Sequence, residues 1–259
     1  MKNFTYSDEL CHYGVLGMKW GIRRYQRRDG SLTKKGKEHF KQMRNISKSM
    51  KDDSYTISSK SGITFQRIGD KNETDTGRTY VSYKKGDNIK YIDMSGEGGI
   101  QGRYKISLKQ ISDLKIASGR AAVEAFLDTW ENTKYEDMVN HIFSPDIVKG
   151  KETAYSKKKR VEAFDALVKA SVDEKTLNMA YKQFSKGLMN GGEVTEKYFK
   201  NLSDKGYNAV IDENDKGWVE NPLIVLDRSK TMKTKNVSEL TQREKDEAIK
   251  WLYKHSRNS

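Results

Sequence analysis

The sequence predicts an α+β fold, and the order of its local patterns is what predicts it. Strand-like runs lie between residues 63 and 108, helix-like periodicity fills the middle of the chain, and strand-like runs return between residues 207 and 226. Strands and helices that are grouped in this way, instead of alternating regularly, are typical of α+β domains. We therefore expect a short basic N-terminal module of turns and a helix at residues 1–50, a linker at 51–61, and a mixed α+β domain with a central helical block at 62–259.

Composition limits the class of protein. Of the 259 residues, 10% are aromatic, which is enough for a folded core. No window offers about 18 apolar residues in a row, so no membrane span is expected. The first ten residues, MKNFTYSDEL, lack the apolar run of a secretory signal. The lone Cys11 excludes an internal disulfide and fits a reducing compartment.

Positive charge is concentrated near the N-terminus. Residues 1–50 hold seven Lys and five Arg against four Asp or Glu, which gives +8 of the total net charge of +13 and leaves +5 for the other 209 residues. A concentrated basic segment favours a polyanionic partner, with nucleic acid first and a membrane surface second. A solvated arm that keeps the chain soluble is an equal alternative.

The N-terminal module is expected to begin with turns and to end in a helix. Glycine loses more conformational freedom in a helix than any other residue, and the first part of the module holds Gly14, Gly17, Gly21 and Gly30. Ser31 or Thr33 is a suitable N-cap for a helix that runs toward Met50. Ser, Lys and Asp then dominate residues 47–61, which predicts the linker.

The larger segment opens with three strand-like runs, at residues 63–68, 78–83 and 103–108. Apolar residues at helical spacing follow at 111–127, 161–168, 177–188 and 198–202.

Strand and helix signals also close the chain. Strands are expected at residues 207–211 and 223–226, and the unbroken apolar run LIVL is typical of a strand that is buried on both faces. Residues 238–255 predict an amphipathic helix, in which Thr241 and Glu244 have the spacing of a capping box.

A dense motif occupies residues 12–36 and reads HYGVLGMKWGIRRYQRRDGSLTKKG. It resembles a module found at the ends of phage and prophage structural or head-associated proteins of Gram-positive bacteria. The resemblance implies phage capsid or portal proteins as partners, and the virion or the host bacterial cytoplasm as the location. Within the motif, aromatic and basic residues alternate: Lys19, Trp20, Arg23, Arg24 and Tyr25. Such a mixture suits docking into a protein groove, stacking on bases with phosphate contacts, or a purely structural role.

Five separate segments resemble the ADP-ribosyltransferase fold. They read TFQR at 64–67, TYVSY at 79–83 with GDNIKY at 86–91, YKISL at 104–108 with LKI at 114–116, GYNAVI at 206–211, and ENPLIVLD at 220–227. The resemblance implies NAD as cofactor and a host protein as acceptor of ADP-ribose. It also implies site residues: Arg67, Tyr80, Ser82 and Tyr83 for binding NAD, and Glu220 as the catalytic carboxylate.

The chemistry of this family explains why these residue types matter. Breaking the bond between nicotinamide and ribose develops positive charge on the ribose, and a neighbouring carboxylate stabilises that charge. An arginine pairs with phosphate oxygens through its forked donors.

The sequence departs from the family pattern at the carboxylate. Counting back from Asp227, the family's glutamate falls on Pro222, which has no carboxylate, and a shift of two residues is needed to restore Glu220. Glu213 and Asp215 in the same turn are alternatives. Three hypotheses stay open, namely an NAD-dependent transferase, a non-catalytic minor structural protein of the virion, and a DNA-binding packaging protein. No metal site is expected, since the four histidines are far apart in the sequence.

Overall fold

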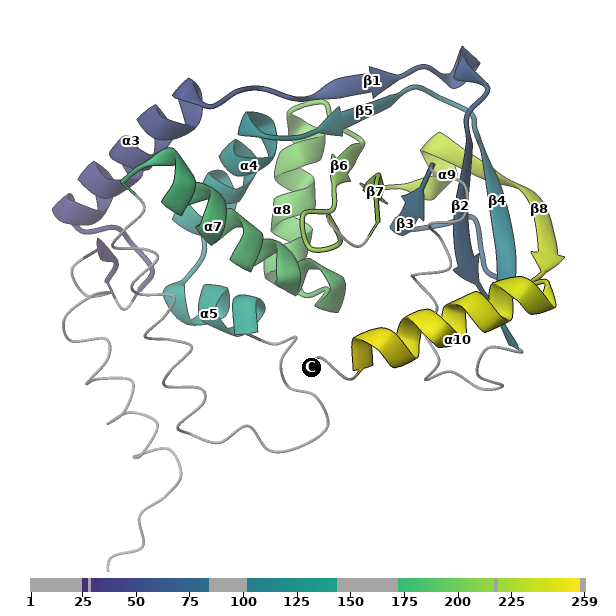
Figure 1. Cartoon of the computed structure of the whole chain (residues 1–259). Coiled ribbons are helices and arrows are strands. Elements are labelled where there is room, and N and C mark those ends of the chain that lie inside the picture. Colours follow the sequence, from purple (N-terminus) through teal and green to yellow (C-terminus); the bar gives the residue numbers. More distant parts are fainter. Residues whose placement is uncertain (1–24, 28, 84–101, 144–171, 217–218, 257–259) are drawn as a thin grey trace, which may run out of the picture. The chain divides into compact units, whose positions relative to one another are not determined.

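The computed structural model describes residues 25–27, 29–83, 102–143, 172–216 and 219–256, which fold as two compact units (Figure 1). The helical unit is the described part of Met1–Asp53 and Gly119–Asp204. The sheet unit is the described part of Ser54–Ser118 and Lys205–Ser259. The general α+β class is therefore confirmed.

The two units divide the chain differently from the prediction of a module at 1–50, a linker at 51–61 and one domain at 62–259. A first boundary does fall at Asp53, but the chain changes unit again after Ser118 and after Asp204. Within the expected linker, Tyr55–Ile57 forms strand β1 and Ser59–Ser61 forms a 3-10 turn, η1. The later boundaries escaped prediction because no change in composition accompanies them.

The helical unit begins with a short hairpin. Gln26 and Leu32 face each other in an antiparallel bridge. In the turn between them, Asp29 Oδ1 accepts hydrogen bonds from the backbone N–H of Ser31 at 2.9 Å and from its hydroxyl at 2.7 Å. Gly30 has a φ of +88°, a left-handed conformation that side chains disfavour. The DGS sequence of the motif is thus accounted for by this turn.

Helix α3, Lys34–Ser49, follows the hairpin. The Thr33 side chain accepts a hydrogen bond from the Gly36 N–H at 3.0 Å, and the helix ends at Met50, so the predicted cap and extent are confirmed. Four more helices and a 3-10 turn complete the unit: α4 (Arg120–Glu131), α5 (Tyr135–Phe143), α7 (Glu174–Ser185), η5 (Lys186–Asn190) and α8 (Glu193–Asp204). The apolar spacing at 177–188 and 198–202 falls on α7 with η5 and on α8, whereas the spacing at 161–168 lies outside the described residues.

Aromatic side chains form the core of the helical unit. The rings of Phe126 on α4 and Phe184 on α7 are 4.9 Å apart, and the buried hydroxyls of Tyr181 and Tyr198 are 2.9 Å apart and share a hydrogen bond. Arg44 of α3 forms salt bridges with two carboxylates of α4. No helix among the described residues is both long enough and apolar enough to cross a membrane.

The sheet unit is built on one eight-stranded sheet, which is mixed and curled (Figure 1). Its strands lie in the order β1-β5-β6-β7-β3-β2-β4-β8, in which β5 and β6 pair in parallel and the other described pairs are antiparallel. The bounds are β2 (Thr64–Gly69), β3 (Thr79–Ser82), β4 (Tyr104–Gln110), β5 (Leu114–Ala117), β6 (Ala209–Ile211), β7 (Pro222–Val225) and β8 (Met232–Glu239), with the helices α9 (Arg228–Thr231) and α10 (Gln242–Ser256).

The two faces of the sheet have different neighbours. One face, which we call the core face, carries the buried apolar cluster that includes Phe65, Val81 and Ile106. Side chains alternate between faces along a strand, so the residues in between define the outer face. On the outer face Ile68 packs against Leu240 and against Ala248 of α10.

Most predicted strands are confirmed to within one or two residues, and β7 is buried along its whole length as expected. The capping box of α10 is also confirmed, since Thr241 N–H donates to Glu244 at 2.9 Å. The helix expected from residue 111 is wrong in its first part, because Leu114–Ala117 forms β5 and the helix begins only after Gly119. Strand β8 was not expected, because its sequence MKTKNVSE has few apolar residues.

Gly36 tests the packing of the hairpin on α3. A Cβ atom at this position would lie 1.9 Å from the Tyr25 carbonyl oxygen. This oxygen belongs to the backbone, so it cannot move aside by a rotamer change as a side-chain atom can. We expect Gly36→Ala to destabilise the chain by about 1–3 kcal/mol despite the better helix propensity of alanine. Thermal unfolding measures this, with Lys37→Ala on the exposed side of the helix as control. Equal melting temperatures of Gly36→Ala and Lys37→Ala would contradict the close packing of the hairpin on α3 at Gly36.

Candidate functional site

The segments predicted to bind NAD lie on three neighbouring strands. Strand β3 lies between β2 and β7, and Ser82 is the cross-strand partner of both Gln66 and Pro222. Residues that are more than 100 positions apart in the sequence are thus brought into one row across the sheet. The predicted residues nevertheless do not share one face.

Arg67 and Tyr83 lie on the core face. Arg67 donates to the Thr79 hydroxyl at 3.1 Å, and Tyr83 packs edge-on against Phe65 with ring centroids 5.9 Å apart. Tyr80 and Ser82 alternate with these residues and lie on the outer face. The four residues that the resemblance assigns to NAD are therefore divided between the two faces.

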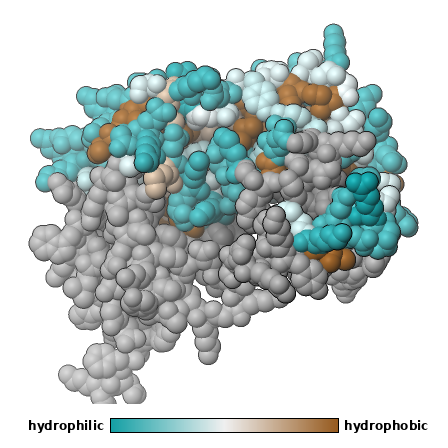
Figure 2. Space-filling view, viewed as in Figure 1, coloured by the Kyte–Doolittle hydropathy of each residue, from teal (hydrophilic) through white to brown (hydrophobic). Residues whose placement is uncertain are grey.

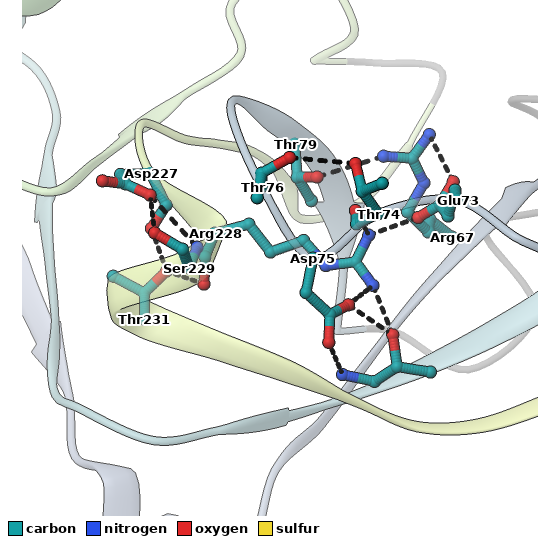
Figure 3. A network of polar contacts seen from close by, with 11 residues as sticks. Arg67, Glu73, Thr74, Asp75, Thr76, Thr79, Asp227, Arg228, Ser229 and Thr231 are labelled. Carbon is teal, nitrogen blue, oxygen red and sulfur yellow. Dashed lines mark hydrogen bonds and ion pairs between the residues drawn. The ribbon is translucent and has the colours of Figure 1, made fainter.

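Arg67 belongs to an internal network of charges (Figure 3). Its Nη2 is 3.3 Å from Glu73, while Arg228 pairs with the other oxygen of the same carboxylate. Burial, and the positive charge of Arg228 nearby, lower the pKa of Arg67. Groups of the protein thus hold both terminal nitrogens of Arg67, although its Nε has no hydrogen-bond partner among the described residues.

Arg228 is the centre of that network. It begins α9 and its side chain is 1% exposed. Its Nη2 lies 2.6 Å from Asp75 and donates to the Thr234 hydroxyl at 2.6 Å, and its backbone N–H donates to the Gly77 carbonyl at 2.8 Å. The loop between β2 and β3, the start of α9 and strand β8 are joined at this one guanidinium (Figure 3).

The outer face holds a pair of carboxylates beside Tyr80. Asp212 follows β6 and is 2% exposed, and Asp215 is 8% exposed. Burial, and the negative charges of Asp212 and Asp215, raise the pKa of Tyr80 to about 12, whereas Arg78 acts in the opposite direction. Tyr80, Arg78 and the two carboxylates are therefore close enough to interact.

Asp212 is the most unusual group of this cluster. Its Oδ1 accepts a hydrogen bond from the Asn214 N–H at 3.0 Å, whereas its Oδ2 is buried with no hydrogen-bond partner among the described residues. Burial, together with the charge of Asp215, raises the pKa of Asp212 to about 7. The backbone N–H of Asp212 donates to the Pro222 carbonyl at 3.0 Å, which holds the carboxyl group next to the start of β7.

The other candidate carboxylates have different surroundings. Glu220 is exposed and precedes β7 by two residues. Glu213 forms a salt bridge with Lys216 at 2.9 Å. Pro222 is itself the first residue of β7 and is buried there. Asp212 is not among the site residues that the sequence predicts. The signal that could have indicated it is its position directly after a predicted strand, three residues before Asp215.

Tyr25 is the one predicted docking residue that the structure describes. Its ring stacks on His39 of α3 at 4.6 Å, and its carbonyl accepts the Thr33 N–H at 2.9 Å. Next to it, Gln26 donates to the Thr133 carbonyl at 2.9 Å. Lys19, Trp20, Arg23 and Arg24 lie outside the described residues.

No group of three or more His, Cys, Asp or Glu residues in the described part of the chain has the geometry to hold a metal ion. The buried His141 contacts the Phe184 carbonyl at 3.1 Å, and burial lowers its pKa to about 4. His141 is therefore a neutral packing residue of the helical unit.

Comparisons with known proteins add one match. Residues 3–27 match the model of a family of unknown function, DUF7211. The match covers the first part of the dense motif and ends inside the hairpin that precedes α3. Neither a curated protein nor a solved structure matches the chain.

The raised pKa of Asp212 gives stability a definite pH dependence. The folded state binds more protons than the unfolded state between pH 4 and 7, because the carboxyl group has a pKa of about 7 when folded and about 3.9 when unfolded. His141, whose pKa is lowered to about 4, acts in the opposite direction up to about pH 6.5, so the contribution of Asp212 is the difference between the wild type and Asp212→Asn. We expect Asp212→Asn to give a more positive slope of the free energy of unfolding against pH than the wild type, and to stabilise the fold by about 3 kcal/mol at pH 8.

Denaturant unfolding between pH 4 and pH 8 measures this slope. The exposed carboxylate of α10 provides the control variant, Asp246→Asn, which should keep the wild-type slope. A slope in Asp212→Asn equal to that of the wild type would show that Asp212 does not titrate as described.

Proposed function

We propose that the sheet unit binds NAD on its outer face and transfers ADP-ribose to a host protein. The observation that carries the proposal is the row formed by Gln66, Ser82 and Pro222. This row makes neighbours of the three segments that resemble the NAD-binding parts of ADP-ribosyltransferases. Ser82 and Pro222 are themselves buried, so the contacts of NAD would come from half-buried neighbours such as Gln66 and Tyr80.

In this proposal the Asp212–Asp215 pair is the carboxylate that the chemistry requires. Two interacting carboxyl groups lose their protons in two separate steps, so the pair keeps one negative charge near neutral pH. That charge stabilises the positive ribose as nicotinamide leaves. Glu220, which the resemblance implies, lies in the same connection before β7 and is the alternative.

The arginine of the proposed site is Arg78 and not Arg67. Arg67 points to the core face and is held by Glu73 and Thr79. Arg78 interacts electrostatically with Tyr80, on the face that carries the carboxylate pair. Its guanidinium is the group suited to the pyrophosphate of NAD.

Release of nicotinamide from NAD by the full-length chain tests this function. We expect Asp212→Asn to lower kcat by on the order of 100-fold with little change in KM, and Arg78→Gln to raise KM. Labelled NAD with a host lysate then identifies an acceptor. The exposed residue of β8 gives a matched control, Glu239→Gln, which should behave as wild type.

The same measurements can refute the proposal or move its carboxylate. Absence of both NAD binding and nicotinamide release by the wild-type chain would discard it. A loss of activity in Glu220→Gln, with full activity in Asp212→Asn, would instead assign the catalytic carboxylate to Glu220.

A second function is proposed for the N-terminal module, namely docking to phage capsid or portal proteins. The fold of the helical unit accounts for Gln26, Asp29, Gly30 and Gly36 of the motif. Lys19, Trp20, Arg23 and Arg24 lie outside the described residues, and they are the mixture of basic and aromatic side chains that suits a protein groove. These four residues are therefore the proposed contact residues.

Two deletions separate docking from folding. Removal of residues 1–24 keeps the sequence of the hairpin and α3 in the chain, and we expect loss of incorporation into particles, with the melting temperature measured to show that the deleted chain is folded. Removal of residues 1–45 also takes away most of α3 and should unfold the helical unit. Normal incorporation of the shorter deletion would contradict docking by this segment.

A further inference from the structure

Three exposed lysines lie at the β4–β8 edge of the sheet. Lys109 on β4 and Lys233 on β8 are direct cross-strand partners on the outer face, and Lys235 follows where the register shifts by one residue. We call these three residues the lysine row. Side chains at directly opposed positions are close together, so the first two charges repel each other.

The other cations of this region are neutralised. Arg103 pairs with Asp70, Lys105 with Glu244 of α10, and Lys230 with Asp227. In the described part of the chain, none of the three lysines of the row forms a salt bridge. Lys233 lies close enough to Asp75 to lower the pKa of that carboxyl group, but Asp75 is itself paired with Arg228, so the lysine row keeps a net positive charge.

Protection of a sheet edge explains only part of this arrangement. Lysines on an edge strand prevent pairing with another chain, and β8 is such a strand. Lys109, however, lies on β4, which is paired on both sides, with β2 and with β8. A lysine there does nothing for the edge and weakens its own strand pair.

We propose that the lysine row binds the phosphates of a nucleic acid. Lys233 and Lys235 follow each other along β8, with Lys235 at the irregularity between Thr234 and Asn236, and Lys109 widens the row across the sheet, which matches an elongated polyanion. A membrane surface fits less well, because the strength of interfacial binding scales with the apolar area that is buried. Of the two exposed large hydrophobic residues in the described sheet unit, Tyr55 lies on β1 at the opposite edge, and Ile111, two residues after Lys109, is the single one near the row.

Polar side chains dominate the described surface. In the view of Figure 2, hydrophilic residues cover most of the described surface and hydrophobic residues form small separate areas. DNA binding at the lysine row does not depend on the proposed NAD chemistry, because it uses other residues and is measured without NAD.

Fluorescence anisotropy with the full-length chain and a labelled DNA duplex of about 30 base pairs tests the proposal at several salt concentrations. Each phosphate contact contributes about 0.9 to the slope of log K against log salt. The triple variant Lys109→Gln/Lys233→Gln/Lys235→Gln should lower that slope by about 3 and weaken binding at least tenfold, equally for all DNA sequences.

A matched triple variant controls for loss of net charge. Lys60, Lys115 and Lys250 are exposed residues of the same unit, and two of them lie near the opposite edge of the sheet. Their replacement by Gln should leave the slope within about 1 of the wild-type value. Equal losses in the two triple variants would overturn the proposal.

Lys109→Glu distinguishes binding from folding. It turns the repulsive pair with Lys233 into an attractive one and leaves Lys233 near Asp75 unchanged, so we expect a higher melting temperature together with weaker DNA binding. Two results with DNA overturn the proposal: no DNA binding by the wild type at low salt, or unchanged DNA binding in the lysine-row variants. A third is a triple variant that loses binding to vesicles of anionic phospholipid while its DNA binding stays at the wild-type level.

Discussion

The buried guanidinium of Arg228 is the interaction on which the rest of the sheet unit depends. An unpaired charge in a protein interior costs several kcal/mol, so a buried arginine is stable only with carboxylates and hydroxyls around it. Glu73, Asp75 and Thr234 provide them from the β2–β3 loop and from β8. The loop is rich in turn-forming residues and has no apolar cluster of its own, and these contacts fix where β3 begins. The register of β3 in turn decides which of its side chains reach the outer face.

That register separates the two arginines of interest. Arg67 and Thr79 meet on the core face, where Glu73 binds Arg67 and Arg228 together. Arg78, one position earlier than Thr79, is placed with Tyr80 and the carboxylate pair. The resemblance to ADP-ribosyltransferases favours Arg67, because Arg67 belongs to the strand segment TFQR at 64–67. The alternation of side chains is the physical reason why Arg78 is the better candidate to meet a ligand.

Local signals were predictable and long-range ones were not. The Thr33 cap, the capping box of α10 and the apolar run of β7 depend on a few adjacent residues, and their predictions are confirmed. Strand β8 could not be recognised, because its stability comes from pairing with β4 and not from its own polar sequence. Arg228 and Asp212 were overlooked since charged residues are almost never fully buried. Only the folded chain shows which charges are removed from water.

The charged groups of the sheet unit are of two kinds, those that stabilise the fold and those that weaken it. Where a charge is buried, as at Arg228, its partners are complete except at one nitrogen, and the arrangement stabilises the fold. Asp212 and the lysine row differ, because each weakens the fold that contains it: Asp212 through an unpartnered oxygen beside another carboxylate, and the lysines through mutual repulsion. Asp212 and the Lys109–Lys233 pair lie on the outer face. The fold itself gives no reason for groups that lower its stability, so the outer face is where we expect a ligand or partner to bind.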